Sequence, residues 1–273
     1  MNRRASSWLV NGALWLGAAA TLFPLLWMAS VSLMPGGASS SYPPPLLPAA
    51  ITLDHYRELF AVQHMGRYFL NSLIVASSAT LLALVLNGMA GYAFAKLHFR
   101  GREALYRLLL AGLLVPVQVT MIPLFGLLKV LGLVNTYAGA IVPAVASIFG
   151  IFLVRQFALS IPDELLDAAR VDGASEWRVF SSVVVPVLRP ILVTLAVFVF
   201  LATWNDFMWP LIVLSDRDML TLPVALASLA SEHVQDNELM MAGAVVTVLP
   251  VLLLFLALQR FYLRGIMAGS LKG

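Results

Sequence analysis

The chain has 273 residues, of which 60% are hydrophobic and only 11% are charged. A soluble domain usually carries about twice that charged fraction, so the composition excludes a disordered chain, a nucleic-acid-binding module and an ordinary cytosolic enzyme. The formal net charge of +3 is mild, and the absence of cysteine excludes disulfides, thiol nucleophiles and thiolate metal sites. The four histidines are scattered without metal-ligand spacing. The solvent of this protein is therefore predicted to be largely lipid.

Six apolar stretches are each long enough to cross a bilayer. A hydrocarbon core of about 30 Å needs about 20 helical residues, and the prolines inside several stretches are tolerated as kinks in packed membrane helices. The first stretch is too long for the apolar core of a signal peptide and predicts an uncleaved helix. We therefore predict an all-α integral membrane protein with six transmembrane helices, at about residues 8–33, 69–94, 105–128, 137–157, 191–214 and 239–261.

The distribution of lysine and arginine predicts the orientation of these helices. With the N-terminus in the cytoplasm, thirteen of the 17 basic residues fall on the inner side. The four on the outer side are Arg57, Arg67, Lys129 and Arg217. Because cytoplasmic loops carry the excess of positive charge, both termini are predicted to be cytoplasmic.

The inner loop, about residues 158–189, predicts two short helices joined by a turn. Ser160 is a candidate cap for the first helix, and Pro162 fits its first turn. Leu165, Leu166, Ala169 and Val171 are predicted to share one apolar side. Gly173 ends this helix, because glycine adopts a left-handed conformation without penalty.

The second helix is predicted to begin at Ser175, which is a candidate cap. Trp177 and Phe180 then recur at helical spacing, which favours packing in a core over an aromatic sugar platform. Pro186 and Pro190 end the helix or lead into the fifth span.

Small side chains at Ala168 and Ala169 would let another surface approach the first helix closely, with Asp167 offering a charge beside them. The alternative is an amphipathic hairpin on the lipid headgroups, which the acidic residues of the first helix disfavour mildly.

These residues resemble the cytoplasmic EAA loop of binding-protein-dependent ABC importer permeases. The family pattern is Glu-Ala-Ala, three residues, glycine, then an apolar segment ending in Leu-Pro. Here Asp167 replaces the glutamate, Gly173 is the glycine and Pro186 closes a segment with valine in place of leucine. The resemblance implies an ATPase-coupling loop near residues 160–190, formed by Asp167, Ala168, Ala169, Asp172, Gly173, Ala174 and Pro186.

Other short segments resemble the sugar-uptake, maltose-type six-span branch of that family. They are Phe69-Leu-Asn-Ser-Leu73, Gly91-Tyr-Ala-Phe-Ala95, Phe99-Arg-Gly-Arg102, Trp204-Asn205-Asp206 and the tail from Tyr262 to Gly273. The resemblance implies a type I ABC importer permease fold that imports a sugar by alternating access across a prokaryotic cytoplasmic membrane. The partners that it implies are a second homologous permease subunit in a heterodimer, two cytosolic ABC ATPase subunits and an extracytoplasmic sugar-binding protein.

The resemblance also suggests a domain division. Residues 1–66 would hold the N-terminal transmembrane helix and an extracytoplasmic loop, residues 67–262 the permease core, and residues 263–273 a cytoplasmic tail. No cofactor is expected on this chain, since it has no Gly-x-x-x-x-Gly-Lys-Ser/Thr loop. ATP-Mg would bind to the partner ATPases.

Asn205 and Asp206 lie in the outer part of the predicted fifth span. An intramembrane carboxylate usually faces a cavity or a partner, which would place both residues on the sugar path. The alternative, a packing role within an aromatic belt, is favoured.

Asn87 and Gln118 are predicted to make packing hydrogen bonds. The acidic outer segment 215–238 fits a solvated connection and a contact with the binding protein equally well.

Two other function classes are disfavoured. An intramembrane enzyme needs a group of acid–base or metal-ligating side chains in its spans, and the sequence offers no candidate catalytic or metal-ligating residues. An ion-coupled secondary transporter often shows inverted repeats or several buried charges, and neither is evident. Within the permease class, the solute alternative to a sugar is a related compound such as glycerol 3-phosphate.

Overall fold

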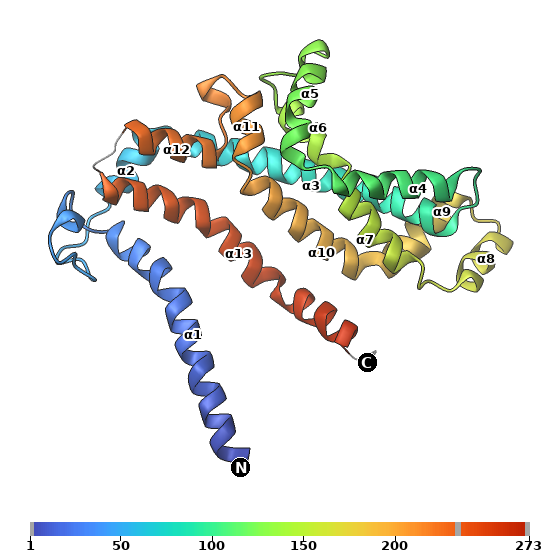
Figure 1. The fold of residues 1–273 in the computed structure, drawn as a ribbon, viewed down its shortest axis with the longest axis horizontal. Coiled ribbons are helices and arrows are strands. Elements are labelled where there is room, and N and C mark those ends of the chain that lie inside the picture. The colour runs from blue at the N-terminus through green and yellow to red at the C-terminus, as the bar shows by residue number, and fades with distance from the viewer. Residues whose placement is uncertain (1–2, 233–235, 271–273) are drawn as a thin grey trace. The chain divides into compact units, whose positions relative to one another are not determined.

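The computed structural model describes residues 3–232 and 236–270, and these residues form helices and connections without a β-strand (Figure 1). Two compact units are present. One comprises residues up to 67 together with 225–250, and the other comprises residues 68–224 together with the chain from 251. The predicted boundaries at 66/67 and 262/263 remain a prediction.

The first unit contains α1 (Arg3–Val31), α2 (Asp54–Ala61), most of α12 (Leu222–Glu232) and the first part of α13 (Asn237–Ser270). The buried carboxylate of Glu238 accepts a hydrogen bond from the Ser39 N–H at 2.7 Å. Ser39 belongs to a short 3₁₀ turn, Ala38–Ser40. This hydrogen bond thus links the turn Ala38–Ser40, which follows α1, to the start of α13.

The second unit holds the remaining helices. They are α3 (Met65–Lys96, from Tyr68 onward), α4 (Arg102–Ala111), α5 (Val117–Val130), α6 (Tyr137–Val145), α7 (Ile148–Ala158), α8 (Asp163–Val171), α9 (Glu176–Val179), α10 (Val185–Trp204) and α11 (Met208–Val213). A π-helical turn, Phe180–Val184, joins α9 to α10. Short 3₁₀ turns lie at Gly112–Leu114 and Arg217–Met219.

Five helical segments of the described residues are long and apolar enough to cross a membrane. They are Val10–Val31, Met65–Lys96, Tyr137–Ala158, Glu176–Trp204 and Asn237–Ala257. The number rises to six if the pair Arg102–Leu114 and Val117–Val130 forms one span, but this pair is bent by 108°. The expected helix at 105–128 is therefore not straight. Pro116 stands before α5 in an extended conformation, and proline ends a helix because it lacks an N–H and restricts the preceding residue.

The fifth span also differs from its prediction. Helical structure begins at Glu176 and ends at Trp204, whereas residues 191–214 were expected to form one helix. The Val185 N–H bonds to the Phe180 carbonyl, five residues back, in the π turn just before Pro186. Pro186 has no N–H and lies in the first turn of α10, so it continues the helix instead of ending it.

Close packing of α3 against α7 builds the core of the second unit. A Cβ added at Gly91 would lie 2.6 Å from the Val154 side chain, so glycine is required for the observed approach. The absence of a side chain at Gly91 therefore permits close packing of the two helices. The surrounding core includes Tyr92, Leu166, Val179 and Leu188, which come from α3, α8, α9 and α10.

Candidate functional site

The hairpin formed by α8 and α9 lies beside the end of α3 (Figure 1). Asp163 and Glu164 occupy the first turn of α8, where the helix dipole favours negative charge. Pro162 is the N-cap residue and provides no side-chain hydrogen bond. The prediction for Ser160 was wrong, because its hydroxyl donates to the Phe157 carbonyl at 2.7 Å and does not accept from an N–H group of α8.

The turn between the helices is fixed by backbone hydrogen bonds. Gly173 has φ +83°, the left-handed conformation that the sequence predicts. Its N–H bonds to the Arg170 carbonyl, and the Ala174 N–H bonds to the Ala169 carbonyl, both at 3.0 Å. This pair of bonds is the Schellman arrangement, which satisfies carbonyls at the end of α8. The Ser175 hydroxyl then caps α9 by accepting from the Arg178 N–H at 3.4 Å, as predicted.

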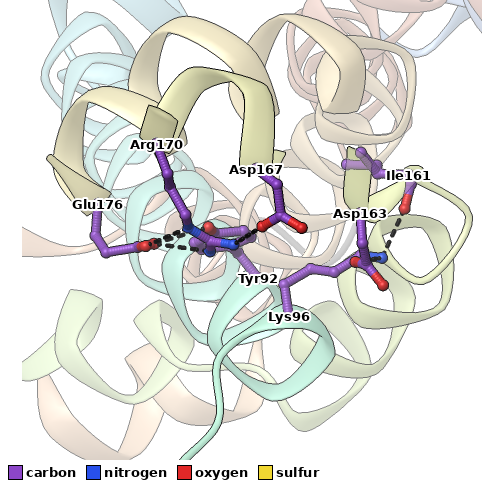
Figure 2. Close-up of polar contacts among 7 residues, drawn as sticks. All are labelled: Tyr92, Lys96, Ile161, Asp163, Asp167, Arg170 and Glu176. Carbon is purple, nitrogen blue, oxygen red and sulfur yellow. Dashed lines mark hydrogen bonds and ion pairs between the residues drawn. The ribbon is translucent and has the colours of Figure 1, made fainter. Parts of the chain in front are cut away.

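Two basic side chains hold the hairpin together and to α3 (Figure 2). Lys96, the last residue of α3, donates to Asp163 Oδ1 at 2.7 Å and to the Ile161 carbonyl at 2.6 Å. Arg170 bridges the two hairpin helices, at 2.8 Å from Asp167 Oδ1 and 2.7 Å from Glu176 Oε1. The contacts therefore fix α8 both to α9 and to the end of a long apolar helix.

A tyrosine on α3 completes this network. The Tyr92 hydroxyl donates to Glu176 Oε2 at 3.1 Å, and its ring packs against Phe180. The hydrogen bond from Lys96 holds the pKa of the Asp163 carboxyl below its usual value. Hydrogen bonds to Glu176 and Asp167 raise the pKa of Arg170 above its usual value. Both shifts favour the charged forms of Asp163 and Arg170.

The residues singled out from the sequence divide between two sides of the hairpin. Ala169 and Ala174 are partly buried and pack against the core. The exposed ones are Asp167, Ala168, Asp172, Gly173 and Pro186. The structure thus places Asp167 and Ala168 together on the open side of α8 and turns Ala169 away from it.

Apolar side chains surround this open side. Leu166 is buried as expected, but Leu165 and Val171 are exposed, Val171 to 87%. Trp177 is 62% exposed, so its predicted place in a core was wrong, whereas Phe180 is partly buried and packed. Leu165 and Val171 lie three residues before and after Ala168, so these exposed apolar side chains flank it on α8 and form a surface suited to contact with another protein.

Asn205 and Asp206 follow the end of α10 and do not lie inside a span. The Asn205 amide donates to the Leu201 carbonyl at 2.8 Å, which closes the last turn of α10. Asp206 Oδ1 accepts from the Trp209 N–H at 3.3 Å at the start of α11. Both residues therefore have a structural role, and Asp206 also lines a pocket.

Asn87 makes the packing hydrogen bonds predicted for it. Its side chain accepts from the Ser147 N–H at 3.1 Å and donates to the Val145 carbonyl, where α6 gives way to α7. The outer segment 215–238 contains more helix than a simple connection would, since all of α12 lies in it. Residues 233–235 of that segment lie outside the described residues.

One cluster of possible metal ligands was missed. His55, Glu58 and Asp236 each offer a ligand atom, and these atoms lie within 4.8 Å of one another. The i, i+3 spacing of His55 and Glu58 was the available sequence signal. However, His55 Nε2 bonds to the Met34 carbonyl, and Asp236 accepts from the Leu239 N–H at the start of α13. Packing and helix capping explain both side chains.

The link between Lys96 and Asp163 yields a prediction for stability. Lys96→Gln should lower the melting temperature more than Asp163→Asn. The lysine side chain is 7% exposed and also donates a hydrogen bond to the Ile161 carbonyl. The Asp163 side chain is 74% exposed and stays solvated. The check is thermal unfolding of the purified protein from pH 4 to pH 8. A larger loss for Asp163→Asn would contradict this assignment.

The pH dependence of that link has a definite sign. Because the folded-state pKa of Asp163 is lowered, its contribution is fully present above the unfolded-state pKa of about 4 and is lost as pH falls through the lower folded-state pKa. The difference between wild type and Asp163→Asn should therefore be constant from pH 6 to pH 8.

Comparison with known proteins agrees with this architecture. Residues 87–267 match the family described as binding-protein-dependent transport system inner membrane component. The arabinooligosaccharides transport system permease protein AraQ of Halalkalibacterium halodurans is 36% identical, with all of both chains covered. The lactose transport system permease protein LacG of Rhizobium radiobacter is 35% identical over 100% of this chain and 98% of its own. The trehalose transport system permease protein SugB of Mycobacterium tuberculosis is 34% identical over 99% of each.

A solved structure shares the fold. One chain of a bacterial ABC transporter that imports the acidic polysaccharide alginate superposes with a TM-score of 0.85, covering 96% of this chain and 99% of that one. At 22% sequence identity, this likeness concerns the fold. The family match identifies this helical chain with several membrane-length segments as an inner-membrane transport component. The chain belongs to the binding-protein-dependent transport system inner membrane component family.

Proposed function

We propose that the chain is a transmembrane permease subunit of an ATP-driven ABC importer that carries a sugar across the cytoplasmic membrane. The relatives with nearly full mutual coverage are named for arabinooligosaccharides, lactose and trehalose, which supports a mono-, di- or oligosaccharide as the solute. The family name supports delivery of that solute by a separate binding protein.

The α8–α9 hairpin is the proposed coupling element, and its ties to the spans are the observation that carries the proposal. Lys96 joins α8 to α3, and Leu166 and Val179 share one core with α3, α7 and α10. A partner that moved the hairpin would therefore move the ends of several spans with it. Alternating access needs such a connection between a nucleotide-driven partner and the solute path.

The proposed assembly contains four kinds of component besides the bilayer. A second, homologous permease subunit forms a heterodimer with this chain, two cytosolic ABC ATPase subunits dock on the inner side, and an extracytoplasmic sugar-binding protein docks outside. ATP-Mg binds to the ATPase subunits, so this chain has no catalytic role. Both termini and the α8–α9 hairpin are cytoplasmic in this proposal, as the basic residues predict.

Uptake by reconstituted vesicles tests the proposal. The complete complex would be placed in proteoliposomes with its binding protein, and radiolabelled arabinotriose, lactose, trehalose and glycerol 3-phosphate would be offered. We expect uptake of at least one sugar with ATP inside, none with ADP, and no loss of uptake when an uncoupler is added. Uptake that an uncoupler abolishes and ATP does not support would show a secondary transporter instead.

A further inference from the structure

A pocket in the second unit lies in the region where α5, α6 and α11 are grouped, away from the α8–α9 hairpin (Figure 1). Its volume is about 360 Å³. Small-molecule sites usually span about 300–1,000 Å³, so the space suits one small polar ligand or one unit of a larger one. The side chains used below are Gln118, Thr203, Asp206 and Trp209, all of which line it.

Two of the lining side chains have hydrogen-bonding capacity that the described part of the chain does not use. Neither the Gln118 amide nor the Thr203 hydroxyl bonds to another of the residues that the structure describes. Gln118 was predicted to make a packing hydrogen bond like Asn87, but it makes none with the residues that the structure describes. A polar side chain on an apolar helix usually faces a water-filled cavity, a ligand or another protein surface, because contact with lipid is costly.

The other two side chains are held rigidly at the pocket. The backbone N–H groups of Met208 and Trp209 orient the Asp206 carboxylate, which has about four acceptor positions and retains some of them. The Trp209 indole N–H donates to the Gly139 carbonyl at 3.0 Å, which fixes the ring. A fixed aromatic surface thus stands beside a carboxylate, an amide and a hydroxyl.

We infer that this pocket binds one pyranose or furanose unit of the transported sugar during its passage. A sugar ring has hydroxyls around its edge and C–H groups on its faces. The hydroxyls match Asp206, Gln118 and Thr203, and the faces match the aromatic ring of Trp209. This inference rests on the proposed function and adds the ligand-contacting residues of this subunit.

Cysteine labelling gives the first test, since the native chain has no cysteine. In the reconstituted complex, Gln118→Cys and Thr203→Cys should react with a positively charged, membrane-impermeant methanethiosulfonate. The transported sugar of the uptake panel, presented on its binding protein with ATP, should slow that reaction several-fold. Ile122→Cys is the matched control, because Ile122 is on the same helix, 82% exposed and outside the pocket lining. It should react slowly and without protection by sugar.

Transport kinetics give the second test. Gln118→Leu and Thr203→Val should each lower the kcat/KM of sugar uptake about fivefold, the value of one lost neutral hydrogen bond of about 1 kcal/mol. The amount of complex in the membrane should not change, because neither side chain bonds to another of the described residues.

The outcomes separate the two proposals. If wild-type vesicles take up sugar but both variants transport normally and neither cysteine is protected, the pocket inference is overturned and the proposed function stands. If wild-type vesicles take up none of the sugars, the proposed function fails, and the pocket inference fails with it. Protection of Ile122→Cys equal to that of Gln118→Cys would also overturn the pocket inference, since the effect would not be local.

Discussion

Replacing Ala168 by tryptophan should abolish most sugar uptake while the protein remains inserted in the membrane. Ala168 is exposed on α8 beside Asp167, and it makes no contribution to the core beneath the hairpin. An indole at this position would hold a docked ATPase subunit away from the helix backbone. Loss of a central contact in a protein interface costs about 2 kcal/mol or more, so uptake should fall about thirtyfold or more. The readouts are uptake and co-purification of the ATPase subunits.

Ala168→Ser is the matched control for that variant. Serine keeps the side chain small, so docking and uptake should remain near the wild-type level. Ala169→Trp provides a contrast, because Ala169 packs against the core of the second unit. Overpacking there should lower thermal stability as well as uptake, whereas Ala168→Trp should leave stability unchanged. Normal uptake by Ala168→Trp with the ATPase still bound would remove this face of α8 from the docking surface.

Gly173→Val should also lower uptake strongly, through the backbone alone. Nothing lies within 4 Å of a Cβ added at Gly173, so valine meets no steric obstacle in its surroundings. The cost arises because φ is +83°, where a side chain destabilises the residue by about 1–2 kcal/mol and β-branched residues are outliers. The two Schellman hydrogen bonds at 3.0 Å would be lost, and α8 would take another angle to α9. We expect uptake about 5- to 30-fold below wild type.

Gly173→Asn separates this effect from the simple presence of a side chain. Asparagine tolerates the left-handed conformation, so most of the uptake and of the ATPase binding should survive. The comparison is made at equal amounts of protein in the membrane. Equal losses for the valine and asparagine variants would show that the conformation of Gly173 is not what matters.

Local sequence signals predicted the turn of the hairpin correctly. Gly173 and Ser175 act on backbone groups within a few residues, so their roles follow from the residue type and its position. The prediction for Ser160 was wrong because both Ser160 and Pro162 are suitable residues for the start of α8. In the structure, Pro162 is the N-cap residue. Such a choice depends on the direction in which the chain enters α8 from α7.

Long-range contacts could not be predicted in the same way. Lys96 and Asp163 are 67 positions apart, and nothing in either segment indicates that they pair. Likewise, the exposure of Trp177 depends on which face of the hairpin packs against α3. Helical periodicity identifies an apolar stripe, but it does not distinguish a stripe facing the protein's own core from one that a partner covers.

The length of an apolar stretch also says little about its path. Residues 105–128 are apolar enough for one span, yet the chain bends by 108° between α4 and α5. That bend leads into α5, whose Gln118 lines the pocket with the residues around α11. The pocket therefore follows from a bend that the hydrophobic pattern did not reveal, although Pro116 was a visible signal for it.

Cross-linking from the hairpin tests the central claim most directly. A single cysteine, Ala168→Cys, would be placed in the otherwise cysteine-free chain, and the assembled complex would be treated with a short bifunctional thiol–amine reagent. The coupling proposal predicts a cross-link to an ATPase subunit, with an efficiency that changes when ATP is bound. A cross-link to the extracytoplasmic binding protein, or none to the ATPase in an actively transporting complex, would contradict it.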